Sequence, residues 1–267
     1  MSQTRTAYHA RWVLPIALSA IVDGAIVIEG STIRYVGVSA GAVADVHVRL
    51  GNCLMMPGLV NAHTHLELTA MRGFLDGLDF RKWLGVLTGA RNDVLDANAL
   101  IDSATVGIHE GLLAGITTYG DCASSVAPLA AMRATGVRGI GYIETFGPDP
   151  KVCDSSLRAL QLTVNAERLG DSALVQTGVS PHAPYTVSRE LFRSVAEWAR
   201  AEALQLSVHV SESEAEIAFV RDGAGPFAER LRERGIAVVA AGVSPVQLLG
   251  DAGVLGTSTL LVHGVQM

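Results

Sequence analysis

From residue 59 onward the sequence alternates short apolar runs with longer amphipathic stretches, and this pattern constrains the fold more than any other feature. Apolar runs of strand length occupy residues 59–65, 116–119, 137–144, 174–179, 206–210 and 259–263. The helix-like stretches between them include residues 98–113, 155–169, 188–204 and 226–234. Strands that alternate with helices predict parallel βα units, of which six can be counted. We therefore expect an α/β fold in which residues 57–267 form a barrel-like domain.

The first 56 residues follow a different pattern, with short β segments joined by turn residues. Residues 25–29 and 32–36 flank Gly30-Ser31, an arrangement typical of a β-hairpin. Residues 46–50 alternate between apolar and polar side chains and predict a further strand. The sequence therefore predicts a small β domain at residues 1–56, ahead of the larger domain.

Composition excludes several classes of protein. Hydrophobic residues make up 49% of the chain and charged residues 17%, which excludes a disordered chain. The 20 basic and 26 acidic residues give a net charge of −6, so we expect no nucleic-acid partner. The apolar stretch 12–22 is interrupted by Pro15 and too short to span a membrane, so we assign it to the β domain rather than to a targeting segment. The three cysteines lie far apart without a CxxC pair, which favours a reducing, cytoplasmic location.

Five of the eight histidines lie at or just after the ends of predicted strands: His63, His65, His182, His209 and His263. Active sites of βα barrels are built at the carboxyl ends of the strands. His63 and His65 are two residues apart on one strand, so both side chains are expected to point toward the barrel axis. Two imidazoles placed in this way can chelate a divalent metal, with a buried histidine pair as the alternative. His209, at the end of another strand, can supply a third nitrogen ligand.

An acidic residue follows the third of these strand ends. Glu212 comes three residues after His209, where it can take a proton from a water activated by the metal. Alternatively, Glu212 caps the next helix together with Ser211. Glu214 and Glu216 are expected at exposed positions of that helix.

The sequence leaves more than one role open for each of the two remaining histidines, His263 and His182. His263 ends the last predicted strand, where it can hydrogen-bond the activated water, complete the ligand set or simply be a core histidine. His182 lies in a loop that two prolines stiffen at little entropic cost, and it is either a substrate contact or part of a structural turn.

Four motifs, PGLVNAHTHLEL, SPHAPY, HVSES and LVHG, occur in this order over nearly the whole chain. Together they resemble the amidohydrolase superfamily, metal-dependent hydrolases with a distorted (β/α)8 TIM-type barrel. The pattern is similar to the cytosine-deaminase-like branch, which includes S-adenosylhomocysteine deaminases and chlorohydrolases. The stretch NAHTHLELTAMRG followed by FRKWL is similar to aminodeoxyfutalosine deaminase. The N-terminal segments are similar to the small β-sandwich domain that accompanies such barrels.

The resemblance implies a metal centre with three histidine ligands, His63, His65 and His209. Binuclear members of the superfamily bridge two metals through a carboxylated lysine or a glutamate on the fourth strand. Residues 174–182 contain neither residue type, so we expect one divalent metal, zinc or alternatively iron.

The resemblance also implies catalytic and substrate-binding residues. Glu212 matches the proton shuttle, and His263 matches the histidine that orients the hydrolytic water. His182 matches a position that touches the substrate. Glu67 and Trp83 lie where relatives bind the heterocycle, although Trp83 could equally serve packing.

One element of the family pattern is missing. The last metal ligand of the family is an aspartate after the eighth barrel strand, whereas this chain ends at Met267, four residues after His263. We therefore expect a C-terminally truncated member, with an incomplete barrel and a small β domain that lacks its C-terminal partner. Strands supplied by another chain are the alternative.

The function expected from this pattern is hydrolytic deamination of an amino-substituted purine, nucleoside or related small heterocycle. A chlorohydrolase or a cyclic-amide hydrolase at the same site is one alternative. An inactive, truncated metal-binding fragment is another. Because relatives are often dimers, a homodimer is possible.

Overall fold

The computed structural model describes residues 3–78 and 80–267, apart from the side chains of residues 80, 81 and 84. The chain divides into two compact units, Met1–Leu59 and Val60–Met267. The first consists mainly of strands, and the second contains a parallel sheet with its helices. Over the residues described, no helix is long and apolar enough to cross a membrane.

A five-stranded sheet forms the first unit. Its strands are β1 (Arg5–Val13), β2 (Ile21–Glu29), β3 (Thr32–Val38), β4 (Val46–Arg49) and β5 (Leu54–Met55). β1 pairs antiparallel with β2 and parallel with β4 and β5. The predicted hairpin is confirmed, because β2 and β3 pair antiparallel across a turn in which Gly30 has a φ of +60°. The apolar stretch 12–22 ends β1, connects it to β2 and begins β2, so it lies within this β unit.

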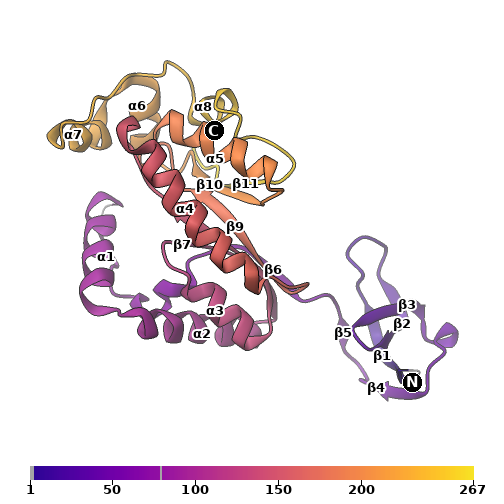
Figure 1. Cartoon of the computed structure of the whole chain (residues 1–267). Helices are drawn as coiled ribbons and strands as arrows, with labels where there is room; N and C mark the ends of the chain where they lie inside the picture. The colour runs from indigo at the N-terminus through magenta and orange to yellow at the C-terminus, as the bar shows by residue number, and fades with distance from the viewer. Residues whose placement is uncertain (1–2, 79) are drawn as a thin grey trace. The chain divides into compact units, whose positions relative to one another are not determined.

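A six-stranded sheet forms the centre of the second unit; Figure 1 shows helices such as α4 beside it. Its strands are β6 (Leu59–Thr64), β7 (Ile116–Ala123), β8 (Arg138–Thr145), β9 (Val175–Pro181), β10 (Leu206–Val210) and β11 (Thr259–His263). They lie side by side in sequence order, and β7 to β11 pair in parallel. The six predicted strands are thus confirmed, and their carboxyl ends share one edge of the sheet.

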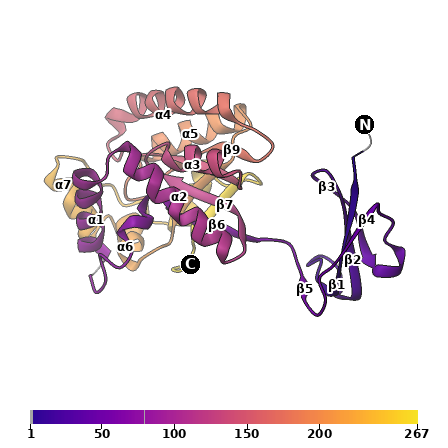
Figure 2. The same cartoon turned by 90° about the horizontal axis from the view of Figure 1, so that it is seen from below.

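Eight α-helices connect or follow these strands within the described residues. They are α1 (Phe80–Val94), α2 (Ala97–Leu113), α3 (Ala127–Thr135), α4 (Cys153–Glu167), α5 (Arg189–Ala201), α6 (Glu214–Asp222), α7 (Gly225–Glu233) and α8 (Pro245–Asp251). The four predicted helices correspond to α2, α4, α5 and α7. The helix expected after Glu212 corresponds to α6. Of the three helices that were not predicted, α3 and α8 have nine residues or fewer, and so few turns leave only a weak helical period. α4 and α5 lie side by side along the sheet (Figures 1 and 2).

The strands separate an apolar face from a polar one. Val208 and Val210 of β10 belong to the buried hydrophobic cluster that joins the sheet to its helices. Because side chains alternate along a strand, Ser207 and His209 point to the opposite face. On that face the Sγ atom of Cys122 in β7 lies 3.4 Å from Ser207 Oγ, although β7 and β10 are not neighbours. The inner face of the sheet is therefore buried and polar.

The sheet curls so strongly that its two end strands approach each other. β6 and β11 stand at opposite ends of the strand order, yet the rings of His63 and His263 are only 5.4 Å apart between centroids. This curvature gathers the carboxyl ends of the strands around one point, as a nearly closed barrel does.

Gly120 in β7 tests how tightly this curled sheet is packed. A Cβ atom at Gly120 would lie 2.4 Å from the carbonyl oxygen of Ala62 in β6, so the two backbones would have to separate. We expect Gly120→Ala to lower the free energy of unfolding by about 1–3 kcal/mol, measured by urea denaturation. Gly89→Ala in α1 is the control, because its Cβ meets nothing within 4 Å. A Gly120→Ala variant as stable as the unaltered chain would contradict this packing.

Candidate metal centre

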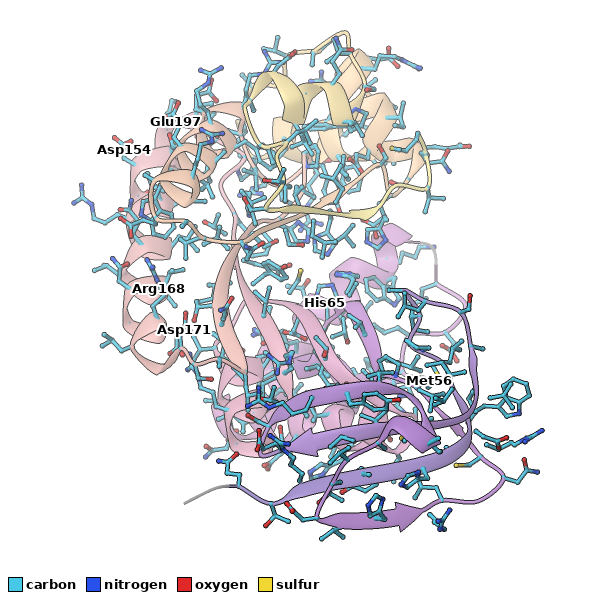
Figure 3. The ribbon with its side chains drawn as sticks, turned by 90° about the vertical axis from the view of Figure 1, so that its right-hand side faces the viewer. Met56, His65, Asp154, Arg168, Asp171 and Glu197 are labelled. Carbon is cyan, nitrogen blue, oxygen red and sulfur yellow. The ribbon has the colours of Figure 1, made fainter. Side chains whose placement is uncertain are left out.

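The five histidines singled out in the sequence gather at the carboxyl edge of the second sheet. His63 lies in β6, and His65 directly follows this strand. Figure 3 shows His65 beside the sheet, away from the outer helix α4, which begins near Asp154 and ends just before Arg168. The ring of His63 lies 4.9 Å from that of His65 and 4.9 Å from that of His209, between centroids.

His209 is the centre of the histidine cluster. Its ring lies 4.7 Å from the ring of His182 and 5.4 Å from that of His263, between centroids. The curled sheet therefore brings together residues that are as much as 200 positions apart in the chain. The predicted grouping of these five imidazoles is what the structure shows.

Hydrogen bonds fix which ring nitrogens carry protons. His65 Nδ1 lies 2.6 Å from the carbonyl oxygen of Cys122, and His209 Nδ1 lies 3.1 Å from that of His182. A carbonyl oxygen only accepts, so each Nδ1 donates and each neutral ring keeps a lone pair on Nε2. These two Nε2 atoms face each other at 3.4 Å.

The spacing of these two nitrogens fits a bound cation. Two lone pairs that face each other without a proton between them repel, whereas a cation between them would bind both. Zinc–nitrogen bonds of about 2.0–2.1 Å at a tetrahedral angle place two nitrogens about 3.3–3.4 Å apart. His63 adds a buried Nδ1 that lacks a hydrogen-bond partner in the structure. The donor set therefore fits a divalent metal.

Further nitrogens lie close enough to join this centre. One ring nitrogen each of His63, His209 and His263 lie within 4.8 Å of one another. This trio includes His263 in place of His65, which was expected as a ligand. His65 lies next to this trio because its Nε2 is 3.4 Å from Nε2 of His209. The structure thus brings four imidazoles around one point, and which three bind most directly stays a proposal.

Burial keeps these imidazoles neutral. Desolvation, followed by repulsion from neighbouring histidines, lowers the pKa of His63 to about 4 and that of His209 to about 2. The pKa of His182 falls to about 3 for the same reasons. A neutral imidazole is the form that binds a metal, so protons compete little with the cation at neutral pH.

Glu212 lies beside His263, on the turn that follows β10. Its Oε2 accepts a hydrogen bond of 2.9 Å from the Tyr185 hydroxyl, and its Oε1 lies 3.4 Å from His263 Nε2. Helix α6 is capped by Ser213, whose hydroxyl accepts from the backbone N–H of Glu216. The alternative role of Glu212 as a helix cap is therefore not what the structure shows.

Glu216 is a correction to the sequence analysis. Glu214 is exposed as expected, but Glu216 has an exposed fraction of 0%. Its two carboxylate oxygens accept hydrogen bonds of 2.9 Å from the backbone N–H groups of Ser211 and Glu212. The chain turns sharply at Ser211, where φ is +55°, and this turn directs both N–H groups toward Glu216. A helical pattern alone does not reveal such a turn, so the residue that anchors the backbone of Glu212 was missed.

Glu67 lies in a buried network rather than in an open cavity. It sits in the 3-10 helix η2 (Leu66–Met71), and its exposed fraction is 3%. Its Oε1 accepts from Arg91 Nε at 3.1 Å and from the Ser124 hydroxyl at 3.3 Å, and Ser125 donates to Oε2. Both oxygens are therefore engaged within the chain.

Trp83 lies in α1 and lines a cavity of about 560 Å³. The same cavity is lined by His65 and by residues of η2 and α2, including Thr69 and Glu110. Trp83 thus reaches a space that adjoins one side of the histidine cluster. Its role in binding a heterocycle remains a proposal.

Glu144 is a site residue that the sequence analysis missed. It lies near the carboxyl end of β8, with 7% of its side chain exposed, and Oε1 is 4.0 Å from His182 Nε2. Burial, followed by repulsion from Glu67, raises its pKa to about 8. Glu144 ends the run predicted at residues 137–144, so the rule that singled out the histidines would have found it. Glu144 lies on the third strand of the second sheet, whereas the glutamate that bridges metals in binuclear relatives lies on the fourth.

Comparison with known families agrees with the geometry. The sequence profile of the amidohydrolase family matches residues 54–266, which include all five clustered histidines and Glu212. The chain belongs to the amidohydrolase family.

Named relatives of this amidohydrolase chain act on nucleosides. A 5-methylthioadenosine/S-adenosylhomocysteine deaminase of Saccharophagus degradans is 30% identical over 272 residues, covering 97% of this chain and 56% of the relative. The chain spans about half the length of the relatives that it matches.

Solved structures share the fold. A zinc-bound adenosine deaminase of Xanthomonas campestris superposes with a TM-score of 0.78 at 23% identity, covering 98% of this chain and 58% of that one. The Helicobacter pylori aminofutalosine deaminase in complex with methylthio-coformycin gives a TM-score of 0.80 at 18% identity, covering 92% and 61%. These likenesses confirm the distorted TIM-type barrel fold of the amidohydrolase unit.

The low pKa of His182 predicts how stability depends on pH. The unfolded chain binds a proton on His182 below about pH 6.5, whereas the folded chain does not until about pH 3. Stability therefore falls as the pH drops through this window, by up to about 1.4 kcal/mol per pH unit for one proton. We expect His182→Gln, without added metal, to show a shallower decline between pH 6 and 4 in urea unfolding. His109→Gln, at an exposed histidine, is the control, and equal slopes for all three proteins would refute the prediction.

Proposed function

We propose that this chain carries the catalytic centre of a metal-dependent hydrolytic deaminase that acts on an amino-substituted purine nucleoside or a related heterocycle. The observation that carries the proposal is the pair of facing Nε2 atoms of His65 and His209, 3.4 Å apart, with the Glu212 carboxylate beside the same cluster. The deaminase activity of the 30% identical relative supports this class of substrate.

One divalent cation is proposed, held by His63, His65 and His209, with His263 within reach. Zinc is favoured over iron because a structure of similar fold contains bound zinc. Such a cation acts as a Lewis acid and makes a hydroxide nucleophile available at neutral pH.

Glu212 is proposed to move the proton that the reaction requires. Its carboxylate takes a proton from the attacking water, whose oxygen bonds to the amino-bearing carbon, and delivers that proton to the adjacent ring nitrogen of the substrate. The remaining proton of the water passes to the amino group, the C–N bond breaks, ammonia leaves and the carbon keeps the oxygen as a carbonyl. Tyr185 holds Oε2 by a hydrogen bond, so Oε1 is the oxygen that stays available beside His263. His263 orients the water in this scheme.

The substrate-binding site is assigned to His182 and Trp83 as contacts and to Glu67 as a positioning residue. His182 lies beside His209, and Trp83 lines the cavity that adjoins His65. Glu67, with both oxygens engaged, contributes by holding Arg91 and the two serines in place. The free cysteines support a reducing, cytoplasmic location.

Ammonia release from a panel of amino-substituted purines and their nucleosides tests the proposal. We expect zinc-loaded protein to release ammonia and Glu212→Gln to lower kcat by roughly 10²–10⁴-fold, the usual contribution of a general acid–base residue. Glu214→Gln, an exposed carboxylate two residues away, should leave kcat unchanged.

Three outcomes would count against it. Full activity of Glu212→Gln would remove the proposed proton shuttle. Chloride release from chlorinated analogues without ammonia release would favour the chlorohydrolase alternative. Bound zinc without turnover on any substrate would favour an inactive metal-binding fragment.

A further inference from the structure

Glu144 has a buried carboxyl oxygen without a partner in the folded chain. Only 7% of its side chain is exposed, and Oε1 has no hydrogen bond. Leaving such an atom unpaired is costly, so we expect a partner from outside the chain, such as a ligand, at this position.

Glu144, whose pKa of about 8 leaves its carboxyl protonated at neutral pH, still accepts through the oxygen that carries no proton, and His182 adds a second acceptor. Its Nδ1 lies 2.8 Å from the Thr186 hydroxyl, which in turn donates to the carbonyl oxygen of Ala183 at 3.1 Å. The single proton of the hydroxyl is thereby used, so His182 Nδ1 must be the donor and Nε2 keeps its lone pair. That lone pair lies on the nitrogen 4.0 Å from Glu144 Oε1.

A second metal ion is not the best occupant of this space. One atom each of Glu144, His182 and His209 lie within 4.8 Å of one another, which resembles a ligand set. However, His209 Nδ1 donates to a carbonyl, and its only free lone pair faces His65 at 3.4 Å. The first centre therefore uses that lone pair, and Glu144 and His182 alone are too few ligands.

We propose that Glu144 and His182 form an acceptor pair that binds an N–H or O–H donor of the substrate, an inference that rests on the proposed function. The pair lies next to His209, so a molecule held there has its reacting atom near the metal centre. The ring of Phe146, 4.9 Å from that of His182 between centroids, offers a flat apolar wall suited to a heterocycle. Glu144 is thus a specificity-determining residue.

Binding of two probes that cannot be deaminated tests the acceptor pair in the zinc-loaded chain. Purine riboside offers sugar O–H donors, purine offers a ring N–H donor, and neither carries the amino group that deamination removes. We expect Glu144→Leu to weaken binding of at least one probe roughly tenfold or more in calorimetric titration, because a buried donor loses its partner. The probe that is affected identifies the donor as O–H or N–H. Glu144→Gln, which keeps one acceptor oxygen, should lose less.

Stability separates a binding role from a structural one. Because Glu144 Oε1 has no partner in the free chain, Glu144→Leu should unfold at the same or a higher urea concentration than the unaltered chain. The same change at Glu216, whose two oxygens are satisfied, should lower the urea midpoint.

Several results would overturn the acceptor pair. These are unchanged affinity of Glu144→Leu for both probes, loss of a zinc equivalent from that variant, and failure of the unaltered chain to bind either probe. Failure of the proposed function looks different: the unaltered chain would bind a probe in a Glu144-dependent manner but release no ammonia from amino-substituted purines.

Discussion

Two imidazole lone pairs that face each other at 3.4 Å are the constraint on which the site depends. Each is held in place because the other nitrogen of its ring donates to a backbone carbonyl, that of Cys122 or that of His182. The sheet itself therefore fixes both tautomers and both ring orientations. Such an arrangement is unfavourable in the free chain and favourable around a cation, so folding energy is spent on preorganising a metal centre.

The curvature of the sheet makes this arrangement possible. Its outer face buries valines such as Val208 and Val210 against the helices, while the alternate positions direct polar side chains inward. Without strong curling, β6 and β11 would lie at opposite ends of the sheet, yet the rings of His63 and His263 nearly touch. The polar interior thus contains groups that are individually costly to bury, such as Glu144 and Glu216. Both oxygens of Glu216 accept hydrogen bonds from backbone N–H groups, whereas Oε1 of Glu144 has no hydrogen-bond partner within the described chain.

Strand–helix alternation was enough to predict the six strands of the second unit and the strand-end grouping of the histidines, because strand period and strand direction fix where a side chain points. Short helices such as α3 and α8 escaped, since tertiary packing rather than periodicity stabilises them. The burial of Glu216 was misjudged for a similar reason. The chain turns at Ser211, which has a left-handed backbone conformation, and the residue type of Ser211 does not predict this turn. Glu144 could have been predicted from its position at a strand end. The hydrogen bonds to both Glu67 oxygens could not, because they come from Ser124 and Ser125, which are distant in the sequence.

Zinc stoichiometry of the purified chain is the most direct measurement of the central claim. The metal-free protein would be titrated with Zn²⁺ at neutral pH, and bound metal counted by atomic emission after gel filtration. We expect one zinc per chain, lost in His65→Ala and in His209→Ala but retained in His109→Ala, whose histidine is exposed and outside the cluster. Zinc retained at full occupancy in both cluster variants, or absent from the unaltered chain, would contradict it.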